Sequence, residues 1–342
     1  MKAVVIREHG GPEVLRLEEI PTPAPGPGEV QVRVRACALN HLDLWIRQGL
    51  PGAPFQLPAT TGADIAGEVS ALGPGVDDVE VGLPVMVLPT RSCGHCEACV
   101  SGHDNLCRQF EVLGEHRQGG LAEFISVPRG NIFPKPPALS FEEAAAASLT
   151  PLTAWHMLVG RAAVREGETV LIQAAGSGVG TAAVQIARHL GARVIATAGS
   201  QAKLDVAREL GAHETINYIE EDFVAAVRRL TDRRGVDVVV EHVGGATFEA
   251  SLRALGWGGR LVTCGATTGA KATVNLRHLF YKNQSILGST MGTKAEYHHL
   301  VRLLRQGVLR PVIHATFPLE AIAEAQRVLD DRAVIGKVVL TV

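Results

Sequence analysis

The sequence has no long apolar run and no excess of charge of either sign. Its apolar runs are far shorter than the roughly 18 residues that a membrane-spanning helix needs. The 33 basic and 35 acidic residues leave a net charge of −2, which gives no reason to expect nucleic acid or a membrane as a partner. Residues 1–6 are typical of a strand and lack the apolar region of a signal peptide. We therefore expect a cytoplasmic protein with a small-molecule substrate.

Cysteine is scarce and unevenly placed. Four of the six cysteines lie in the stretch 93–107, with the spacing C-x2-C-x2-C-x7-C. Four thiolates in one short loop can surround a single tetrahedral zinc ion and leave no open coordination position. We therefore predict one structural zinc rather than a disulfide framework, with free or disulfide-bonded cysteines as the alternative. The predicted ligands are Cys93, Cys96, Cys99 and Cys107.

The stretch 169–200 has the most regular pattern in the chain. A short apolar run at 170–172 leads into a glycine-rich turn at 176–180. Apolar residues then recur at helical spacing until Gly191, which stands where a helix C-cap would stand. A second apolar run follows at 194–196. Strand, glycine turn, helix and strand within about 30 residues are typical of a dinucleotide-binding βαβ unit.

The glycine turn is a variant of the G-x-G-x-x-G pattern. Aligned on Gly180, the three glycine positions hold Ala175, Ser177 and Gly180. Small residues let the backbone approach a pyrophosphate, and the N-terminus of the following helix offers free N–H groups. A plain turn is the alternative, and the position between a strand and a periodic helix favours the cofactor loop. The predicted cofactor contacts in this turn are Ala175, Gly176, Ser177, Gly178, Val179 and Gly180.

The end of the second strand of this unit indicates which cofactor is used. NAD-specific sheets place an acidic residue there to bind the adenosine ribose, and this chain has Ala198 instead. Ser200 then offers a hydroxyl, and Lys203 offers a positive charge one helical turn further on. We therefore predict that NADP(H) is favoured over NAD(H), with a solvated surface lysine as the alternative for Lys203.

Two domains are expected from the length and from a change of pattern near residue 150. The first part of the chain is rich in short strands and turns. The second part alternates strands with helices, which is typical of a parallel sheet covered on both faces. The predicted domains are 1–150 with 290–342, including a metal lobe at 90–108, and 151–289. Strands expected in the second domain include 214–217, 236–241, 260–264 and 285–288.

Taken together, these motifs resemble the medium-chain dehydrogenase/reductase superfamily over essentially the whole chain. The matching stretches are the Pro/Gly turn near residue 25, G-A-D-I-A-G at 62–67, the cysteine lobe, the glycine turn, 237–244 and 258–265. The resemblance implies an α/β protein with a GroES-like β-rich catalytic domain and a Rossmann domain. It also implies an NAD(P)-dependent oxidoreductase that forms a homodimer or homotetramer. Further cofactor contacts implied by the resemblance are Thr153, Tyr218, Val243, Gly244 and Gly265.

Two branches of this superfamily compete for the chain. The zinc alcohol dehydrogenases hold a catalytic zinc with a Cys, the His of a Gly-His-Glu motif, and a third Cys or acid. Cys37 matches the first ligand, but Ala63 stands where the His belongs and Leu149 falls near the third ligand. Leu39 replaces the hydroxyl residue that relays the alcohol proton. The resemblance therefore implies that a catalytic zinc, which needs about three protein ligands, is absent.

The stretch 40–49 instead looks like the pattern N-x-x-D-x-x-x-R-x-G of the quinone oxidoreductase-like branch. Asn40 is the first candidate for donating a hydrogen bond to substrate, and Asp43 for fixing the backbone nearby. Conjugated enones and quinones are already electrophilic, and hydrogen bonds can stabilise the enolate that forms. The leading hypothesis is therefore NAD(P)H-dependent hydride transfer to an activated alkene, quinone or carbonyl without catalytic zinc. The alternatives are a zinc alcohol dehydrogenase with an unusual metal site and a non-catalytic nicotinamide-nucleotide sensor.

Overall fold

The computed structural model describes residues 1–49 and 55–342, and the chain forms two compact units. Unit 1 contains Met1–Leu149, Thr293–Arg305 and Pro311–Val342. Unit 2 contains Thr150–Gly292 and Gln306–Arg310. The chain therefore leaves unit 1 twice, near residue 150 and again for five residues after Arg305, and returns to it each time. Within the described residues, none of the helices has both the length and the apolar character needed to span a membrane.

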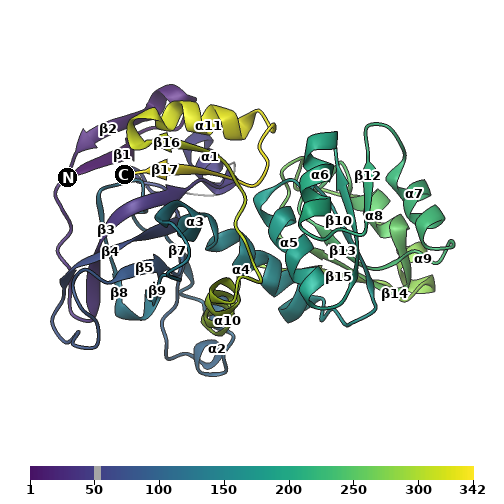
Figure 1. Ribbon diagram of the computed structural model, residues 1–342, viewed down its shortest axis with the longest axis horizontal. Helices are drawn as coiled ribbons and strands as arrows, with labels where there is room; N and C mark the ends of the chain where they lie inside the picture. The colour runs from purple at the N-terminus through teal and green to yellow at the C-terminus, as the bar shows by residue number, and fades with distance from the viewer. Residues whose placement is uncertain (50–54) are drawn as a thin grey trace. The chain divides into compact units, whose positions relative to one another are not determined.

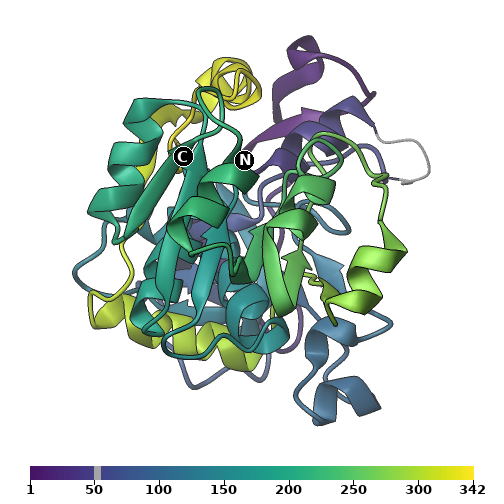
Figure 2. The ribbon, with the colours of Figure 1, turned by 90° about the vertical axis from the view of Figure 1, so that its right-hand side faces the viewer.

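Unit 2 is built on a six-stranded parallel sheet, whose strands are seen side by side in Figure 2. The strand order is β12-β11-β10-β13-β14-β15, and each neighbouring pair is parallel. This is the doubly wound order of a Rossmann fold, so the predicted fold of this part of the chain is confirmed. The strands are β10 (Thr169–Ile172), β11 (Arg193–Ala198), β12 (Glu214–Asn217), β13 (Val236–Glu241), β14 (Leu255–Thr263) and β15 (Ser285–Gly288).

Helices cover both faces of this sheet. Figure 1 shows α5 and α6 on one side of the strands and α7 and α8 on the other. All four residues of β10 are buried, as expected for a central strand with helices on both sides. The helices are α5 (Gly178–His189), α6 (Gln201–Glu209), α7 (Phe223–Leu230), α8 (Phe248–Ala254) and α9 (Leu276–Tyr281).

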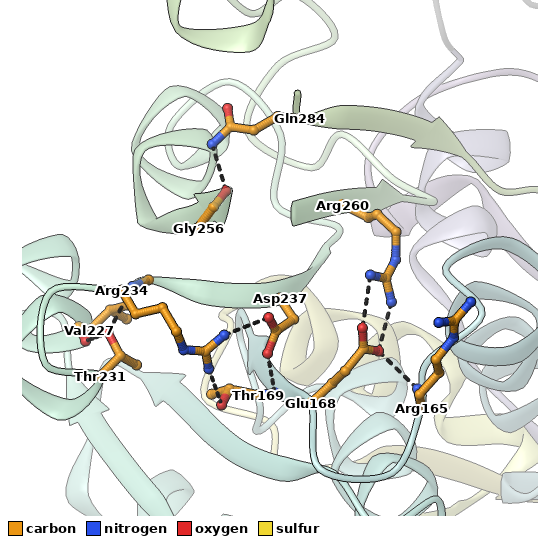
Figure 3. Close-up of polar contacts among 11 residues, drawn as sticks. Arg165, Glu168, Thr169, Val227, Thr231, Arg234, Asp237, Gly256, Arg260 and Gln284 are labelled. Atoms are coloured by element: carbon orange, nitrogen blue, oxygen red, sulfur yellow. Dashed lines mark hydrogen bonds and ion pairs between the residues drawn. The ribbon is translucent and has the colours of Figure 1, made fainter. Parts of the chain in front are cut away.

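Charged pairs tie the amino ends of the central strands together (Figure 3). Glu168, just before β10, accepts two hydrogen bonds of 3.0 and 2.7 Å from the guanidinium of Arg260 in β14. Asp237 in β13 accepts one from Arg234 at 2.6 Å and one from the backbone N–H of Thr169 at 2.7 Å. These contacts fix the strand ends opposite the carboxyl edge, and the carboxyl edge is where doubly wound sheets bind ligands.

Unit 1 contains a largely antiparallel seven-stranded sheet, and its GroES-like fold is confirmed. The strand order is β16-β17-β3-β4-β5-β9, and β8 pairs with β3. A separate hairpin joins β1 to β2. The strands are β1 (Lys2–Ile6), β2 (Leu15–Glu19), β3 (Glu29–Ala38), β4 (Asp64–Leu72), β5 (Pro84–Val87), β8 (Phe124–Pro128), β9 (Ile132–Pro134), β16 (Ile313–Pro318) and β17 (Lys337–Thr341).

The antiparallel pairing of β3 brings distant parts of the chain to one end of this sheet. The last residue of β3, Ala38, lies opposite Asp64, the first residue of β4. Ala38 also pairs with Val339, near the start of β17. The residues just after β3 therefore lie beside the starts of two other strands, and this is where the polar cluster described below forms.

Helices and one small lobe complete unit 1. The lobe contains β6 (Thr90–Arg91), α2 (Glu97–Val100) and β7 (Glu111–Val112), and Figure 1 shows α2 close to α10. The carboxylate of Asp104 in the lobe accepts hydrogen bonds from the backbone N–H of Lys294, the first residue of α10. The helices are α1 (His41–Gln48), α3 (Phe141–Ala146), α10 (Lys294–Arg305) and α11 (Ile322–Asp330), and α4 (Leu149–Trp155) begins at the last residue of unit 1.

Candidate functional site

The four predicted metal ligands come together in the lobe. The Sγ atoms of Cys93, Cys96, Cys99 and Cys107 all lie within 4.8 Å of one another, and the structure records all four cysteines as free. Individual Sγ–Sγ distances are 3.5 Å for Cys96–Cys99 and 3.8 Å for Cys93–Cys99 and Cys96–Cys107. Four sulfurs bound tetrahedrally at about 2.3 Å from one zinc ion would lie about 3.8 Å apart. The cluster therefore has the size and the ligand chemistry of a closed tetrahedral site.

Backbone N–H groups of the lobe point at the same sulfurs. Cys96 donates to the Sγ of Cys93 at 3.4 Å, and Gln109 donates to the Sγ of Cys107 at 3.3 Å. Hydrogen bonds from the backbone of His95 and Cys96 lower the pKa of the Cys93 thiol to about 6. Such donors favour the thiolate, which is the form that binds a metal ion.

In unit 2, the glycine turn leads into the N-terminus of α5. Ser177 is the N-cap residue, and its hydroxyl accepts a hydrogen bond of 3.0 Å from the backbone N–H of Gly180. The same hydroxyl lies 2.9 Å from Nε2 of His242, the residue after β13. Ala174, just before the turn, has a positive φ of 47°. The turn thus places the N-terminus of α5 at the carboxyl edge of the sheet, an arrangement that is typical of pyrophosphate binding.

Lys203 lies over this turn although it is distant in sequence. A Cβ atom added to Gly176 would come within 2.7 Å of Cγ of Lys203, so the two residues are in direct contact. A Cβ atom added to Gly199 would lie 2.8 Å from the hydroxyl oxygen of Tyr218, so these two residues are also in contact. Ser200 is the N-cap of α6 but makes no capping hydrogen bond with its side chain. Of the residues predicted to surround an adenosine 2′-phosphate, Lys203 therefore lies directly against the glycine turn.

The remaining predicted cofactor residues follow β13 and β14 or lie in α4. Backbone N–H groups of Val243 and Gly244 donate to the carboxylate of Glu241, which is fully buried at the end of β13. Burial raises the pKa of Glu241, and these hydrogen bonds oppose the rise. Gly265 follows β14 and lies near His242, while Thr153 is buried in α4. Glu241 thus holds the turn after β13 in place and was not predicted from the sequence.

In unit 1, Asn40 is the N-cap residue of α1 and Asp43 completes a capping box with it. The Asp43 carboxylate accepts hydrogen bonds from the backbone N–H of Asn40 at 2.7 Å and of Gly62 at 2.8 Å. Asp43 is buried, and burial raises its pKa. The two predicted catalytic residues are therefore adjacent. The carboxylate of Asp43 holds the backbone just after β3, at Asn40, and just before β4, at Gly62.

The side chain of Asn40 belongs to a buried charged cluster. Its Nδ2 donates to Oδ2 of Asp64 at 3.0 Å, and its Oδ1 accepts from Nζ of Lys337 at 2.6 Å. Lys337 also forms an ion pair with Asp64 at 2.8 Å. The other oxygen of Asp64 accepts from the backbone N–H of Leu149 at 2.5 Å. Lys337 was missed in the sequence because one lysine at the start of an apolar strand looks like a surface residue.

The positions that match a catalytic zinc site have a donor set that does not suit zinc. Cys37 offers one buried thiol, and burial raises its pKa. Ala63 has no ligand atom, and the Asp64 carboxylate is neutralised by Lys337. Leu149 contributes its backbone N–H rather than a side-chain ligand. Because a zinc ion needs about three ligand side chains, no step of the chemistry is assigned to a metal ion here.

Comparison with known proteins places both units in one family. Residues 26–137 match the alcohol dehydrogenase GroES-like domain, and residues 178–306 match the zinc-binding dehydrogenase domain. The human quinone oxidoreductase is 31% identical over 99% of this chain and 97% of its own length. A 2-haloacrylate reductase from a Burkholderia species is 32% identical over 99% of this chain and 98% of its own length.

A solved structure described as an NAD-dependent alcohol dehydrogenase has 51% sequence identity to this chain. It covers all of this chain and all of its own, with a TM-score of 0.97. The relatives are described as an oxidoreductase, a reductase and an NAD-dependent alcohol dehydrogenase, and they support the predicted NAD(P)-dependent dehydrogenase or reductase. The chain belongs to the medium-chain dehydrogenase/reductase superfamily.

Proposed function

We propose that this protein reduces activated alkenes, quinones or related carbonyls by hydride transfer from NADPH, without a catalytic zinc. The observation that carries the proposal is the donor set at the positions that match a catalytic zinc site: Ala63 has no ligand atom, Leu149 offers only its backbone N–H, and the neighbouring Asp64 is paired with Lys337. A conjugated acceptor needs no Lewis acid to make it electrophilic. It needs hydrogen-bond donors for the oxygen that gains negative charge. Reduction by relatives named quinone oxidoreductase and 2-haloacrylate reductase supports the same class of substrate.

Each unit would have its own part in this reaction. The N-terminus of α5 and the glycine turn would bind the pyrophosphate, and Lys203 with Ser200 would bind the 2′-phosphate. Bound NADPH would supply the hydride, as a cofactor supplies the chemistry and the protein orients it. In unit 1, Asn40 would orient the substrate oxygen, and Asp43 would hold the backbone on which Asn40 depends.

A substrate panel tests this proposal. The purified protein is assayed with NADPH and NADH against quinones, 2-alkenals, enones and 2-haloacrylates, and with NADP⁺ and NAD⁺ against simple alcohols. We expect reduction of at least one class of activated acceptor with no stimulation by added zinc. Turnover of alcohols alone, dependent on a second zinc ion, would contradict the proposal.

A second candidate is the oxidation of alcohols with NAD⁺ through an unusual metal site. The observation that favours it is the 51% identity to a protein described as an NAD-dependent alcohol dehydrogenase. Metal analysis separates the two candidates. We propose one structural zinc per chain, held by the four cysteines of the lobe, whereas a catalytic site as well would give two zinc ions per chain.

The contact of Lys203 with the phosphate-binding turn gives a prediction on cofactor choice. We expect the wild type to prefer NADPH, and Lys203→Ala to weaken NADPH binding by about 1–3 kcal/mol, the range for a hydrogen bond to a charged group. Because NADH has no 2′-phosphate, its affinity should change little. Dissociation constants for both cofactors, measured by fluorescence titration, check this result. Equal loss for the two cofactors would mean that Lys203 only packs against Gly176.

We also propose that the protein forms a homodimer through the β15 edge of unit 2. The strand β15 ends the sheet, and large apolar side chains are exposed near it. They are Trp257, Leu276, Phe280, Tyr281 and Ile286. An open strand edge with apolar surface is typical of an interface rather than of a monomer surface.

Light scattering tests the proposed dimer. We expect the wild type to have at least twice the mass of one chain, and Trp257→Glu to shift it towards the monomer because the charge would be buried. Val81→Glu is the matched control, since Val81 is exposed to a similar degree, 62% against 64%, but lies in unit 1. A monomeric wild type, or equal effects of the two substitutions, would contradict an interface at β15.

A further inference from the structure

Lys337 is a buried lysine whose ammonium is held by two side chains. It is 4% exposed, and its partner Asp64 is fully buried. The ammonium donates to Oδ2 of Asp64 at 2.8 Å and to Oδ1 of Asn40 at 2.6 Å. A buried ion pair gains little stability over apolar residues of similar size. Its presence beside Asn40 therefore suggests a role other than holding the fold together.

The cluster fixes the orientation of the Asn40 carboxamide. The oxygen faces an ammonium and the nitrogen faces a carboxylate, so a flipped amide would meet two repulsive partners. The backbone of Asn40 is fixed as well, because its N–H donates to Asp43. An asparagine amide has two N–H groups, and Asp64 accepts only one of them. The second N–H is therefore the donor that remains for a ligand, and Asn40 keeps 9% of its surface exposed.

The ammonium also changes the strength of this remaining donor. A positive charge at the carbonyl oxygen draws electron density from the amide nitrogen, and hydrogen bonds in a chain strengthen one another in a medium of low dielectric constant. Asp64 accepts from the same nitrogen and acts in the opposite sense, so the ammonium of Lys337 makes the second N–H of Asn40 a stronger donor than it would be beside Asp64 alone. A preorganised donor of this kind stabilises charge that develops during a reaction.

We propose that Lys337 is a positioning residue that, with Asp64, orients and polarises Asn40 so that its second N–H binds the substrate oxygen. The inference rests on the proposed reduction. Hydride addition to the β-carbon of a conjugated acceptor oxidises NADPH to NADP⁺ and leaves negative charge on that oxygen. The α-carbon is then protonated by water, which gives the saturated product. The polarised amide of Asn40 takes the place that a metal ion has in alcohol dehydrogenation.

The substitution Lys337→Met tests the role of the ammonium. Removal of one oxyanion donor lowers kcat by about 10²–10³-fold in well-studied enzymes, and here the donor is weakened rather than removed. We therefore expect kcat to fall about 10- to 100-fold, with KM changed less than about threefold, as for an interaction that strengthens in the transition state. Lys337→Arg should restore part of kcat, and Lys135→Met is the control for loss of a lysine elsewhere in unit 1.

Asn40→Ala distinguishes a positioning role of Lys337 from a purely structural one. In that background Lys337→Met should lower kcat by less than about threefold, because the group that it polarises is gone. The side-chain amide signals of Asn40 in an NMR spectrum, assigned by their loss in Asn40→Ala, should shift in Lys337→Met. If Lys337→Met does not fold, the charge-free pair Asp64→Asn with Lys337→Met replaces it, and the same fall in kcat is expected.

If the wild type is active, two outcomes would overturn the inference. One is a wild-type kcat in Lys337→Met or in the charge-free pair. The other is an equal loss of kcat from Lys337→Met with and without Asn40, which would mean that the lysine acts on the fold. A wild type that reduces no acceptor in the panel overturns the proposed function and this inference together. Normal reduction that is insensitive to Lys337 overturns the inference alone.

Discussion

Cys99→Ser is expected to release the metal ion of the lobe and to lower the melting temperature. Serine is a poor zinc ligand, and a structural zinc contributes its binding free energy, about 10–16 kcal/mol in small zinc domains, to local folding. The lobe is joined to the rest of unit 1 through Asp104 and the first residue of α10. If the free energy of unfolding of unit 1 as a whole fell by only about 2 kcal/mol, the melting temperature would fall by about 4–8 °C.

Metal analysis and calorimetry on the purified variant check this prediction. His103→Ala is the matched control, because His103 lies in the same lobe and its Nδ1 contacts the backbone oxygen of Ser101 rather than the cysteine cluster. The control should keep its zinc and its melting temperature. The fraction of Cys99→Ser protein that remains folded should transfer hydride at close to the wild-type rate. A variant that keeps both its zinc content and its melting temperature would show that the four cysteines do not bind the metal.

The strands of the Rossmann domain could be predicted closely because their signals are local. β12, β13 and β15 have the bounds that the sequence predicted, since each is a short apolar or β-branched run between turns. The strand β14 was predicted from residue 260 but begins at Leu255. Gly258 and Gly259 lie inside this strand, and a register shift in the pairing of β13 with β14 lets the strand continue through them.

The candidate site was only partly predictable from the sequence. The predictable parts are formed by residues close together in the chain, and the other parts join residues that are far apart in it. The cysteine cluster and the glycine turn are encoded by residues close together in the chain. The helix α1 was missed because its eight residues form little more than two turns, too few for a helical repeat to stand out, and its start depends on Asp43 binding the backbone. The contact of Lys337 with Asn40 joins residues 297 positions apart. Only the pairing of β17 with β3 brings them together, and no local pattern signals it.

Gly180→Ala is expected to weaken cofactor binding and to destabilise unit 2. A Cβ atom at this position would lie 2.4 Å from the backbone oxygen of Ala174 and 2.6 Å from Cα of Ala175. Both atoms belong to the backbone that leads from β10 into the glycine turn, so this backbone or the start of α5 must move. Overpacking of this kind costs about 1–3 kcal/mol. A shift of the N–H groups that face the pyrophosphate should weaken NADPH by at least about tenfold, or about 1.4 kcal/mol.

The sign of the change in stability shows whether the close approach at Gly180 matters. Glycine to alanine within a helix normally stabilises it by up to about 1 kcal/mol, so a loss of stability would come from the close approach alone. Gly26→Ala in unit 1 is the control, because the nearest atom to an added Cβ there is the side-chain Oε2 of Glu29 at 3.3 Å. Thermal unfolding and NADPH titration of both variants give the comparison. Wild-type values for Gly180→Ala would mean that the turn has room for a side chain and that Gly180 does not position the cofactor.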